Sequence, residues 1–239
     1  MKVSVIIPIY NVAAYIARCV RSLLGQTLDD VEFIFVDDCS SDDSIFILEA
    51  VIKEFPKRAE TIKLIRHSQN MGLPAARNSG LEMAEGEYIF HCDSDDWLES
   101  TALENLYYVA QQKNADFVWC DWYLAFPQSR RLMKQPDYYT PQEALRGMLA
   151  GIMKYNVWNK LIKKELYIKN GILFPDGHGM GEDMTIIRLL ACAKQVAYVP
   201  KALYNYVKRE GEAFTNSWSK KHLDDLFFNT YITIDFLKK

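Results

Sequence analysis

The first half of the chain alternates short apolar runs with segments of helical periodicity, and this alternation limits the possible folds more than any other feature. The apolar runs are rich in β-branched and aromatic residues, as buried strands are, and span 3–9, 32–38, 61–67, 87–92 and 115–124. Segments with apolar residues at helical spacing lie between them, at 12–24, 41–55, 75–84 and 99–114. Strands that alternate with helices predict βαβ units and a mostly parallel sheet.

The second half of the chain is less regular. Residues 125–140 are polar and contain two prolines, which predicts a loop. Helices are expected at 140–151 and 181–194, and a short strand at 195–200. The helical pattern after residue 219 ends abruptly, so we expect a chain that has been cut short there.

Composition excludes several classes of function. A net charge of −3 and a pI of about 5.9 give no electrostatic signature of a protein that binds nucleic acid or an anionic membrane. The five cysteines are scattered without a CxxC pair, which predicts reduced thiols rather than a disulfide scaffold or a zinc ribbon. No apolar stretch approaches the roughly 18 residues that span a bilayer. We expect a cytoplasmic protein. Peripheral contact with the inner face of the membrane and the oligomeric state are both left open.

Acidic residues follow two of the predicted strands. Asp37 and Asp38 end one of them, and the sequence DSDD at 93–96 follows another. In parallel α/β sheets, ligands bind at the carboxyl ends of the strands. Neighbouring carboxylates disfavour one another's charge, whereas Mg²⁺ or Mn²⁺ is held by one or two carboxylates together with substrate phosphates. The pattern predicts a divalent cation carrying a phosphorylated ligand; the alternative is a solvated turn that caps the helix at 99–114.

Five sequence segments in order resemble the family 2 glycosyltransferases, which have the GT-A fold. They are VSVIIPIYN, IFVDDCSSDDS, NMGLPAARNSGLEMAEGEYIFHCDSDDWL, WNKLIKKEL and GEDM, and the resemblance runs from about residue 3 to about residue 209. It implies a single domain over 1–239 with a Rossmann-like, mostly parallel mixed sheet of roughly seven strands flanked by helices. Within that domain it implies a nucleotide-sugar half, a smaller acceptor half and a C-terminal helical segment, at 1–115, 116–209 and 210–239.

The resemblance also implies roles for residues of the donor side. The residues matching the donor-site motifs would line the nucleotide base, hydrogen-bond the uracil, or lie near the diphosphate and ribose; they are Pro8, Tyr10, Asp38, Asn70, Arg77, Ser94 and Asp95. Asp95, together with Asp93, would bind Mn²⁺ or Mg²⁺.

On the acceptor side, Asp183 matches the catalytic base of the family, with Glu182 as the fallback. The residues expected around the acceptor are Trp158, Asn159, Lys160, Glu182 and Arg209. Trp158 could stack on a sugar or lie in the core. Of the two histidines considered as ligands, His91 is expected in the core or at its rim, and His178 either borders the acceptor or has no role.

The activity that the resemblance implies is inverting transfer of a hexose or N-acetylhexosamine. The donor would be a nucleoside diphosphate sugar, with UDP expected, and the acceptor a saccharide or lipid-linked saccharide of bacterial-type cell-surface polysaccharide synthesis. The alternatives are a Mg²⁺-dependent phosphatase of the haloacid dehalogenase type, a nucleotidyltransferase, and a non-catalytic module that binds sugar nucleotides or protein. The basic run Arg130, Arg131 and Lys134 predicts a solvated loop, or an attraction for an anionic acceptor.

Overall fold

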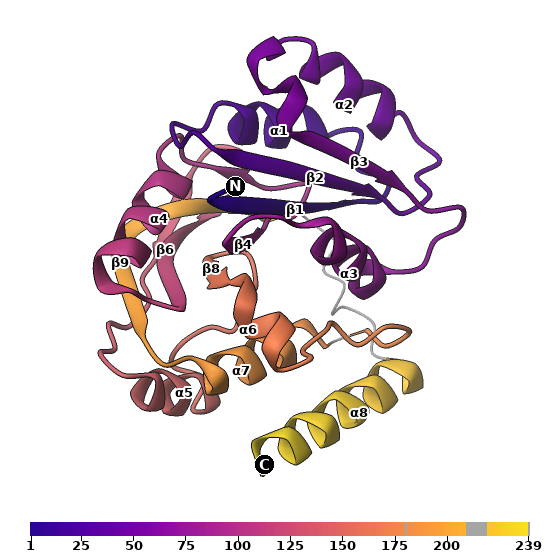
Figure 1. The fold of residues 1–239 in the computed structure, drawn as a ribbon. Coiled ribbons are helices and arrows are strands. Elements are labelled where there is room, and N and C mark those ends of the chain that lie inside the picture. The colour runs from indigo at the N-terminus through magenta and orange to yellow at the C-terminus, as the bar shows by residue number, and fades with distance from the viewer. Residues whose placement is uncertain (180, 209–218, 239) are drawn as a thin grey trace.

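The computed structural model describes residues 1–179, 181–208 and 219–238, and one curled sheet organises them (Figure 1). The strands that the structure describes are β1 (Val3–Ile9), β2 (Val31–Asp37), β3 (Ile62–Arg66), β4 (Tyr88–His91), β5 (Trp97–Leu98), β6 (Phe117–Ala125), β7 (Arg130–Met133), β8 (Lys160–Lys163) and β9 (Val196–Val207). Their order in the sheet is β3-β2-β1-β4-β8-β6-β9-β5, with β7 paired to β6.

The first half of the sheet is parallel, as the alternation of strands and helices predicts. β1 lies between β2 and β4, and β3 extends the sheet beyond β2, all in parallel. β8 joins this half to the second half through antiparallel pairs with β4 and β6, and β6 pairs in parallel with β9. Most paired residues of the sheet are therefore in parallel ladders, and the fold class inferred from the sequence is confirmed.

Helices cover both faces of the sheet. Those described are α1 (Ile16–Leu24), α2 (Ser44–Ile52), α3 (Leu73–Met83), α4 (Ala102–Lys113), α5 (Pro141–Leu149), α6 (Lys164–Lys169), α7 (Glu182–Cys192) and α8 (Lys220–Leu237), with the 3₁₀ turn η1 (Pro56–Thr61). In Figure 1, α1 and α2 lie on one side of β1–β3 and α3 lies on the other. Because both faces are covered, β1 and β2 are buried along their whole length, which accounts for their mostly apolar sequences.

The second half of the fold differs from the sequence-based expectation. The predicted loop 125–140 contains the edge strand β7, whose four residues are mostly exposed and include two arginines. β8 and α6 were not predicted, and the short strand expected at 195–200 is the twelve-residue β9. The sheet accordingly has nine strands in the described part of the chain, rather than about seven. Among the residues described, no helix combines the length and hydropathy that a membrane span requires.

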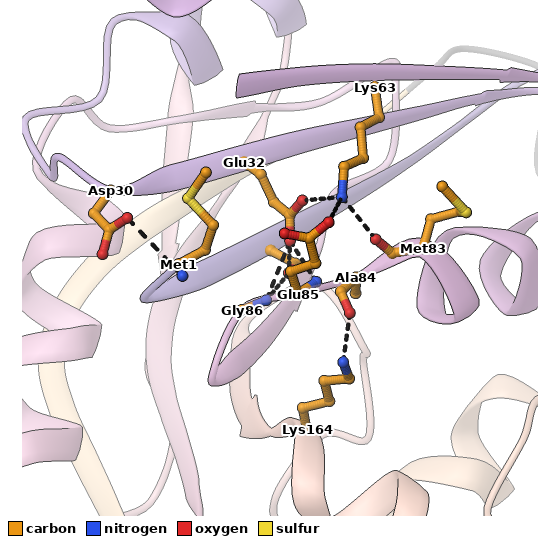
Figure 2. Close-up of polar contacts among 10 residues, drawn as sticks. Met1, Asp30, Glu32, Lys63, Met83, Ala84, Glu85, Gly86 and Lys164 are labelled. Carbon is orange, nitrogen blue, oxygen red and sulfur yellow. Dashed lines mark hydrogen bonds and ion pairs between the residues drawn. The ribbon is translucent and has the colours of Figure 1, made fainter. Parts of the chain in front are cut away.

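A buried carboxylate fastens the turn before β4 at the amino edge of the sheet (Figure 2). The Glu32 side chain accepts hydrogen bonds from the backbone N–H groups of Glu85 and Gly86, at 2.6 and 3.1 Å. The Lys63 ammonium forms an ion pair with Glu32 at 2.8 Å, which compensates the buried negative charge, and it also contacts the Glu85 carboxylate at 2.6 Å. The Ser4 hydroxyl completes the set, donating to Glu32 at 2.6 Å. This network sets where β4, and hence the acid-rich loop after it, begins.

Replacing Gly86 with alanine is expected to lower the free energy of unfolding by about 1–3 kcal/mol, as overpacking at a buried position does. An added Cβ would lie 2.5 Å from the Ser4 backbone nitrogen and 2.7 Å from the Val3 carbonyl carbon, so the backbone must shift. Urea denaturation measures the effect. Gly179→Ala is the matched control, since its Cβ would meet only an ordinary 3.5 Å contact. Equal stability of the two variants would contradict the prediction.

Candidate active site

Asp96, the last acid of the loop 93–96, is a structural residue. It is buried, and its carboxylate accepts hydrogen bonds from the Tyr204 hydroxyl at 2.8 Å and the Val207 backbone N–H at 2.7 Å. Burial raises the pKa of Asp96 well above its ordinary value, and the two neighbouring aspartates add to that rise. Protein donors on β9 therefore hold one of the three carboxylates of this cluster, and the other two are Asp93 and Asp95, the metal ligands that the family resemblance implies.

A fully buried guanidinium connects the acid-rich loop to helix α7. Arg77, on α3, lies 2.8 Å from the Asp93 carboxylate and also pairs with Glu182, the first residue of α7. Burial opposes the charge of Arg77, but the two carboxylates outweigh it and raise its pKa above the ordinary value. These ion pairs join two segments far apart in the sequence. Arg77, which the family resemblance places near the donor, is thus also a structural link.

Asp183 lies next to this ion pair in the first turn of α7. It is exposed, in contrast to the buried side chains that follow it on the helix. Protein groups around the carboxyl partly remove it from water, and this desolvation raises the pKa of Asp183 to about 6. The charge of Glu182 adds to the rise, whereas that of Lys160 opposes it. A carboxylate that is accessible and titrates near neutral pH has the properties of a general base. Glu182, the fallback base, is engaged by Arg77.

The carboxylate of Asp38, at the end of β2, organises the loop that precedes α3. It accepts hydrogen bonds from the backbone N–H groups of Met71 at 2.8 Å and Gly72 at 2.7 Å, and His67 Nδ1 lies 2.7 Å away. Gly72 has φ of +90°, a conformation that side chains rarely adopt. Asp38 is 3% exposed. A hydrogen bond to a nucleotide base would therefore use the small accessible edge of a carboxylate that already positions this loop.

The other residues expected on the donor side lie around the carboxyl ends of the first strands. Pro8 is buried within β1, and Tyr10 follows that strand with half of its surface exposed. Asn70 is exposed in the loop before α3. Ser94 is buried, and Asp95 after it is half-buried, with a backbone carbonyl that accepts a 3.4 Å hydrogen bond from Arg18.

Trp158 lies in an aromatic cluster, which is the core alternative considered for it. Its ring stacks on Tyr204 at a centroid distance of 4.4 Å and on Tyr206 at 5.3 Å, and meets Trp122 edge-on at 5.0 Å. The side chain is 6% exposed. In this arrangement Trp158 packs against the end of β9.

Asn159 and Lys160, also expected near the acceptor, are buried. The Asn159 amide donates to the Cys120 carbonyl at 2.8 Å. The Lys160 ammonium donates to the carbonyl oxygens of Lys154 and Asn156 and to the Asn159 side chain, at 2.9, 2.5 and 2.8 Å. Burial lowers the pKa of Lys160 to about 7, while three acceptors in place favour the charged form.

The two histidines occupy different surroundings. His91 is buried in the core, as expected, where its ring meets Phe174 edge-on at 5.1 Å. His178 precedes α7 and lies 2.9 Å from the Asp225 carboxylate of α8, with its ring stacked on Phe228. Helix α8 therefore braces the loop that leads to Asp183. Arg209 lies outside the described residues.

Sequence reasoning missed two residues that support the site. Tyr204 accepts a hydrogen bond from the Asp93 backbone N–H at 3.1 Å while it donates to Asp96, so one hydroxyl holds both ends of the acid-rich loop. Nothing local in the sequence distinguishes it from other strand tyrosines. His67 links Asp38 to the Ser79 hydroxyl at 2.9 Å. Its place directly after β3 could have identified it by the strand-end argument that selected Asp38.

The side chains of the acid-rich loop fit a cation that a substrate helps to hold. Within residues 1–179, 181–208 and 219–238, no group of three or more histidine, cysteine or acidic side chains is arranged to bind a metal ion. Asp93 and Asp95 offer oxygen ligands, and Asp96 is turned to Tyr204. Mg²⁺ and Mn²⁺ are commonly bound by one or two carboxylates plus phosphate oxygens, which matches this donor set.

Comparisons of the sequence and of the structure with known proteins agree with one another. Residues 4–185 match the family described as glycosyl transferase family 2. The chain is 33% identical to a cholesterol galactosyltransferase of Borreliella burgdorferi, over 98% of this chain and 67% of that one. It is 31% identical to the glycosyltransferase GlyG of Streptococcus pneumoniae, over 91% of this chain and 76% of that one.

One similar solved structure is that of Staphylococcus aureus TarS residues 1–349 in complex with UDP. It superposes with a TM-score of 0.80 at 22% identity, which is evidence of a common fold. The alignment covers 99% of the present chain and 65% of that one, so this chain spans just under two thirds of TarS 1–349.

Proposed function

Because the chain belongs to glycosyl transferase family 2, we propose that it moves a hexose or N-acetylhexosamine from a nucleoside diphosphate sugar, with UDP as the expected nucleotide, to a hydroxyl group of its acceptor. The acceptor is a saccharide or lipid-linked saccharide of bacterial-type cell-surface polysaccharide synthesis, and the anomeric configuration inverts. The observation that carries this proposal is the Arg77 bridge, which brings the Asp93 loop and the first turn of α7 to one place.

The chemistry follows from that arrangement. The acceptor oxygen attacks the anomeric carbon, the bond from that carbon to the phosphate oxygen breaks, and the diphosphate departs with the electron pair. Asp183 takes the proton from the attacking hydroxyl, a contribution typically worth ~10²–10⁴-fold in rate. A divalent cation bound at Asp95 and Asp93 would neutralise charge on the departing diphosphate. Arg77 fixes Asp93 relative to α7, so the donor side and the base keep their spacing.

Binding of UDP with Mn²⁺ is expected to raise the melting temperature. A ligand at 100 times its dissociation constant stabilises the fold by about 2.7 kcal/mol, and for a domain of this size each kcal/mol corresponds to about 2–4 °C. We therefore expect a shift of about 5–10 °C. Differential scanning fluorimetry with UDP, Mn²⁺, both, or inorganic phosphate provides the measurement. Stabilisation by phosphate alone, with none from UDP and Mn²⁺, would contradict the proposal.

The pH dependence of turnover should report Asp183. With a pKa near 6, the carboxylate is protonated and inactive as a base below that pH, and it becomes competent as the pH rises through 6. The expected profile of kcat/KM rises about tenfold per pH unit below 6 and is flat from about 7 upward. Steady-state assays between pH 4.5 and 8.5 with a cognate donor and acceptor test this. A profile that stays level from pH 5 would remove Asp183 from the proton transfer.

A further inference from the structure

A recess of about 940 Å³ lies beside the acid-rich loop. Its wall is formed by the start of α1, by β5, by the β6–β7 hairpin and by the end of β9. None of the residues proposed for the donor or for the catalytic base lines it. Ligand pockets typically measure about 300–1,000 Å³, so this recess has room for more than one sugar-sized unit.

The recess adjoins the proposed cation loop through Arg18 and through Trp97, which directly follows Asp96. Arg18 lines it, stacks its guanidinium on the Trp97 ring at 3.7 Å, and donates to the Asp95 backbone carbonyl at 3.4 Å. A ligand that contacted Arg18 would therefore lie next to the loop that is proposed to hold the cation and the diphosphate. That position is suited to a part of the acceptor beyond its reacting unit.

The charged side chains that line the recess are all positive. Among its described residues, Arg18, Arg130 and Lys208 are basic and none is acidic. A smaller recess of about 460 Å³ shares Arg130 but includes Glu99 and Asp121, so its charges are mixed. Arg130 is anchored to Glu99 at 2.6 Å, outside the larger recess, and Lys208 is exposed at the end of β9. Grouped cations in a concave wall favour an anionic ligand.

We propose that this recess binds a negatively charged glycan or polyol chain, as the remote part of an acceptor that carries phosphate or carboxylate groups. The inference rests on the proposed function and narrows its acceptor class. The lining also includes the aromatic residues Tyr15 and Phe126, and Trp97 with one ring face covered by Arg18. Aromatic surface beside cations suits a ligand that carries both apolar sugar or polyol faces and charged groups. Binding here is separate from binding of the nucleotide.

Titration calorimetry with the protein saturated with UDP and Mn²⁺ tests the proposal. The probes are a short ribitol phosphate oligomer, an oligogalacturonate, and a neutral maltooligosaccharide of equal length. We expect at least one anionic probe to bind with UDP present, and its affinity to fall with rising salt because the attraction is electrostatic. Equal binding of the neutral probe, or displacement of the anionic probe by UDP, would overturn the assignment. The identity of the tighter probe separates phosphate from carboxylate.

The Lys208→Glu variant tests whether the anionic probe binds in this recess. Reversing this charge is expected to weaken the anionic probe by about tenfold, on the order of 1.4 kcal/mol. Lys113→Glu, an exposed lysine at the end of α4, makes the same change of net charge away from the recess and should leave the affinity unchanged. Equal losses in the two variants would refute the site. A thermal shift with UDP and Mn²⁺ that persists when no anionic probe binds would refute this inference alone, whereas loss of both would refute the proposed function.

Discussion

Replacing Asp183 with asparagine is expected to lower kcat by about 10²-fold or more while donor affinity stays nearly constant. Asparagine keeps the size of the side chain but cannot accept the proton, so the loss falls on the transition state rather than on the bound ground state. The measurement is steady-state kinetics with a cognate donor and acceptor, together with UDP binding by calorimetry. The residual activity should also lose its dependence on pH near 6.

The stability of the Asp183 variant separates a catalytic role from a structural one. The pKa of Asp183 in the fold is about 6, above its ordinary 3.8, so the charged form is disfavoured in the folded state. The stability linked to this group is present at low pH and is lost as the pH rises through 6. An asparagine amide is uncharged at any pH, so the Asp183→Asn variant should be at least as stable as the parent protein at pH 7.

Asp176→Asn is the matched control for that experiment. Asp176 is an exposed acid in the loop before α7, and removing its charge alters the net charge equally. It should leave kcat unchanged. If Asp183→Asn retained full activity, Asp183 would not be the base, and the same assay on Glu182→Gln would then examine the fallback.

The first half of the fold could be predicted because its signals are local. β1, β2 and β4 are buried on both faces, so their sequences are mostly apolar runs that begin and end within about two residues of the expected bounds. The helices between them show helical spacing, and the acids follow the strands directly. Here one physical cause, the covering of both faces, determines both the sequence pattern and the topology.

The second half depends on contacts that no short segment encodes. β8 has the sequence KLIK, and its first lysine is buried only because three acceptors from the preceding turn surround the ammonium. β7 is a basic edge strand that reads as a loop. β9 contains Pro200, which by propensity ends a strand, yet an irregularity in its pairing with β6 accommodates the residues around it.

The candidate site shows the same division. The strand-end rule selected Asp38 and the acids at 93–96, and the family resemblance selected Asp183. Neither could assign partners: that Asp96 is held by Tyr204, or that Arg77 lies between two carboxylates, is a result of tertiary packing. Residue type and spacing identify the acids, whereas the three-dimensional structure is needed to tell which of them are held by protein partners.

Replacing Arg77 with methionine is expected to lower the free energy of unfolding by about 3–5 kcal/mol. Methionine occupies most of the same volume but leaves the Asp93 and Glu182 carboxylates without the cation that both contact. Removing the fully buried cation costs up to this much because the two carboxylates, which are 27% and 28% exposed, are left without their counter-charge. Urea denaturation at pH 7 measures the loss, and UDP binding with Mn²⁺ should weaken as the Asp93 loop loses its link to α7.

A triple variant distinguishes an electrostatic cost from a packing cost. If uncompensated charge is the cause, adding Asp93→Asn and Glu182→Gln to Arg77→Met should restore part of the lost stability, since neutral amides do not need the guanidinium. The two amide substitutions made alone, with Arg77 present, should instead destabilise the fold, because they leave that buried cation unpaired. Additive losses in all three variants would show that Arg77 acts by filling space, and the link between the two halves of the site would then rest on packing rather than on charge.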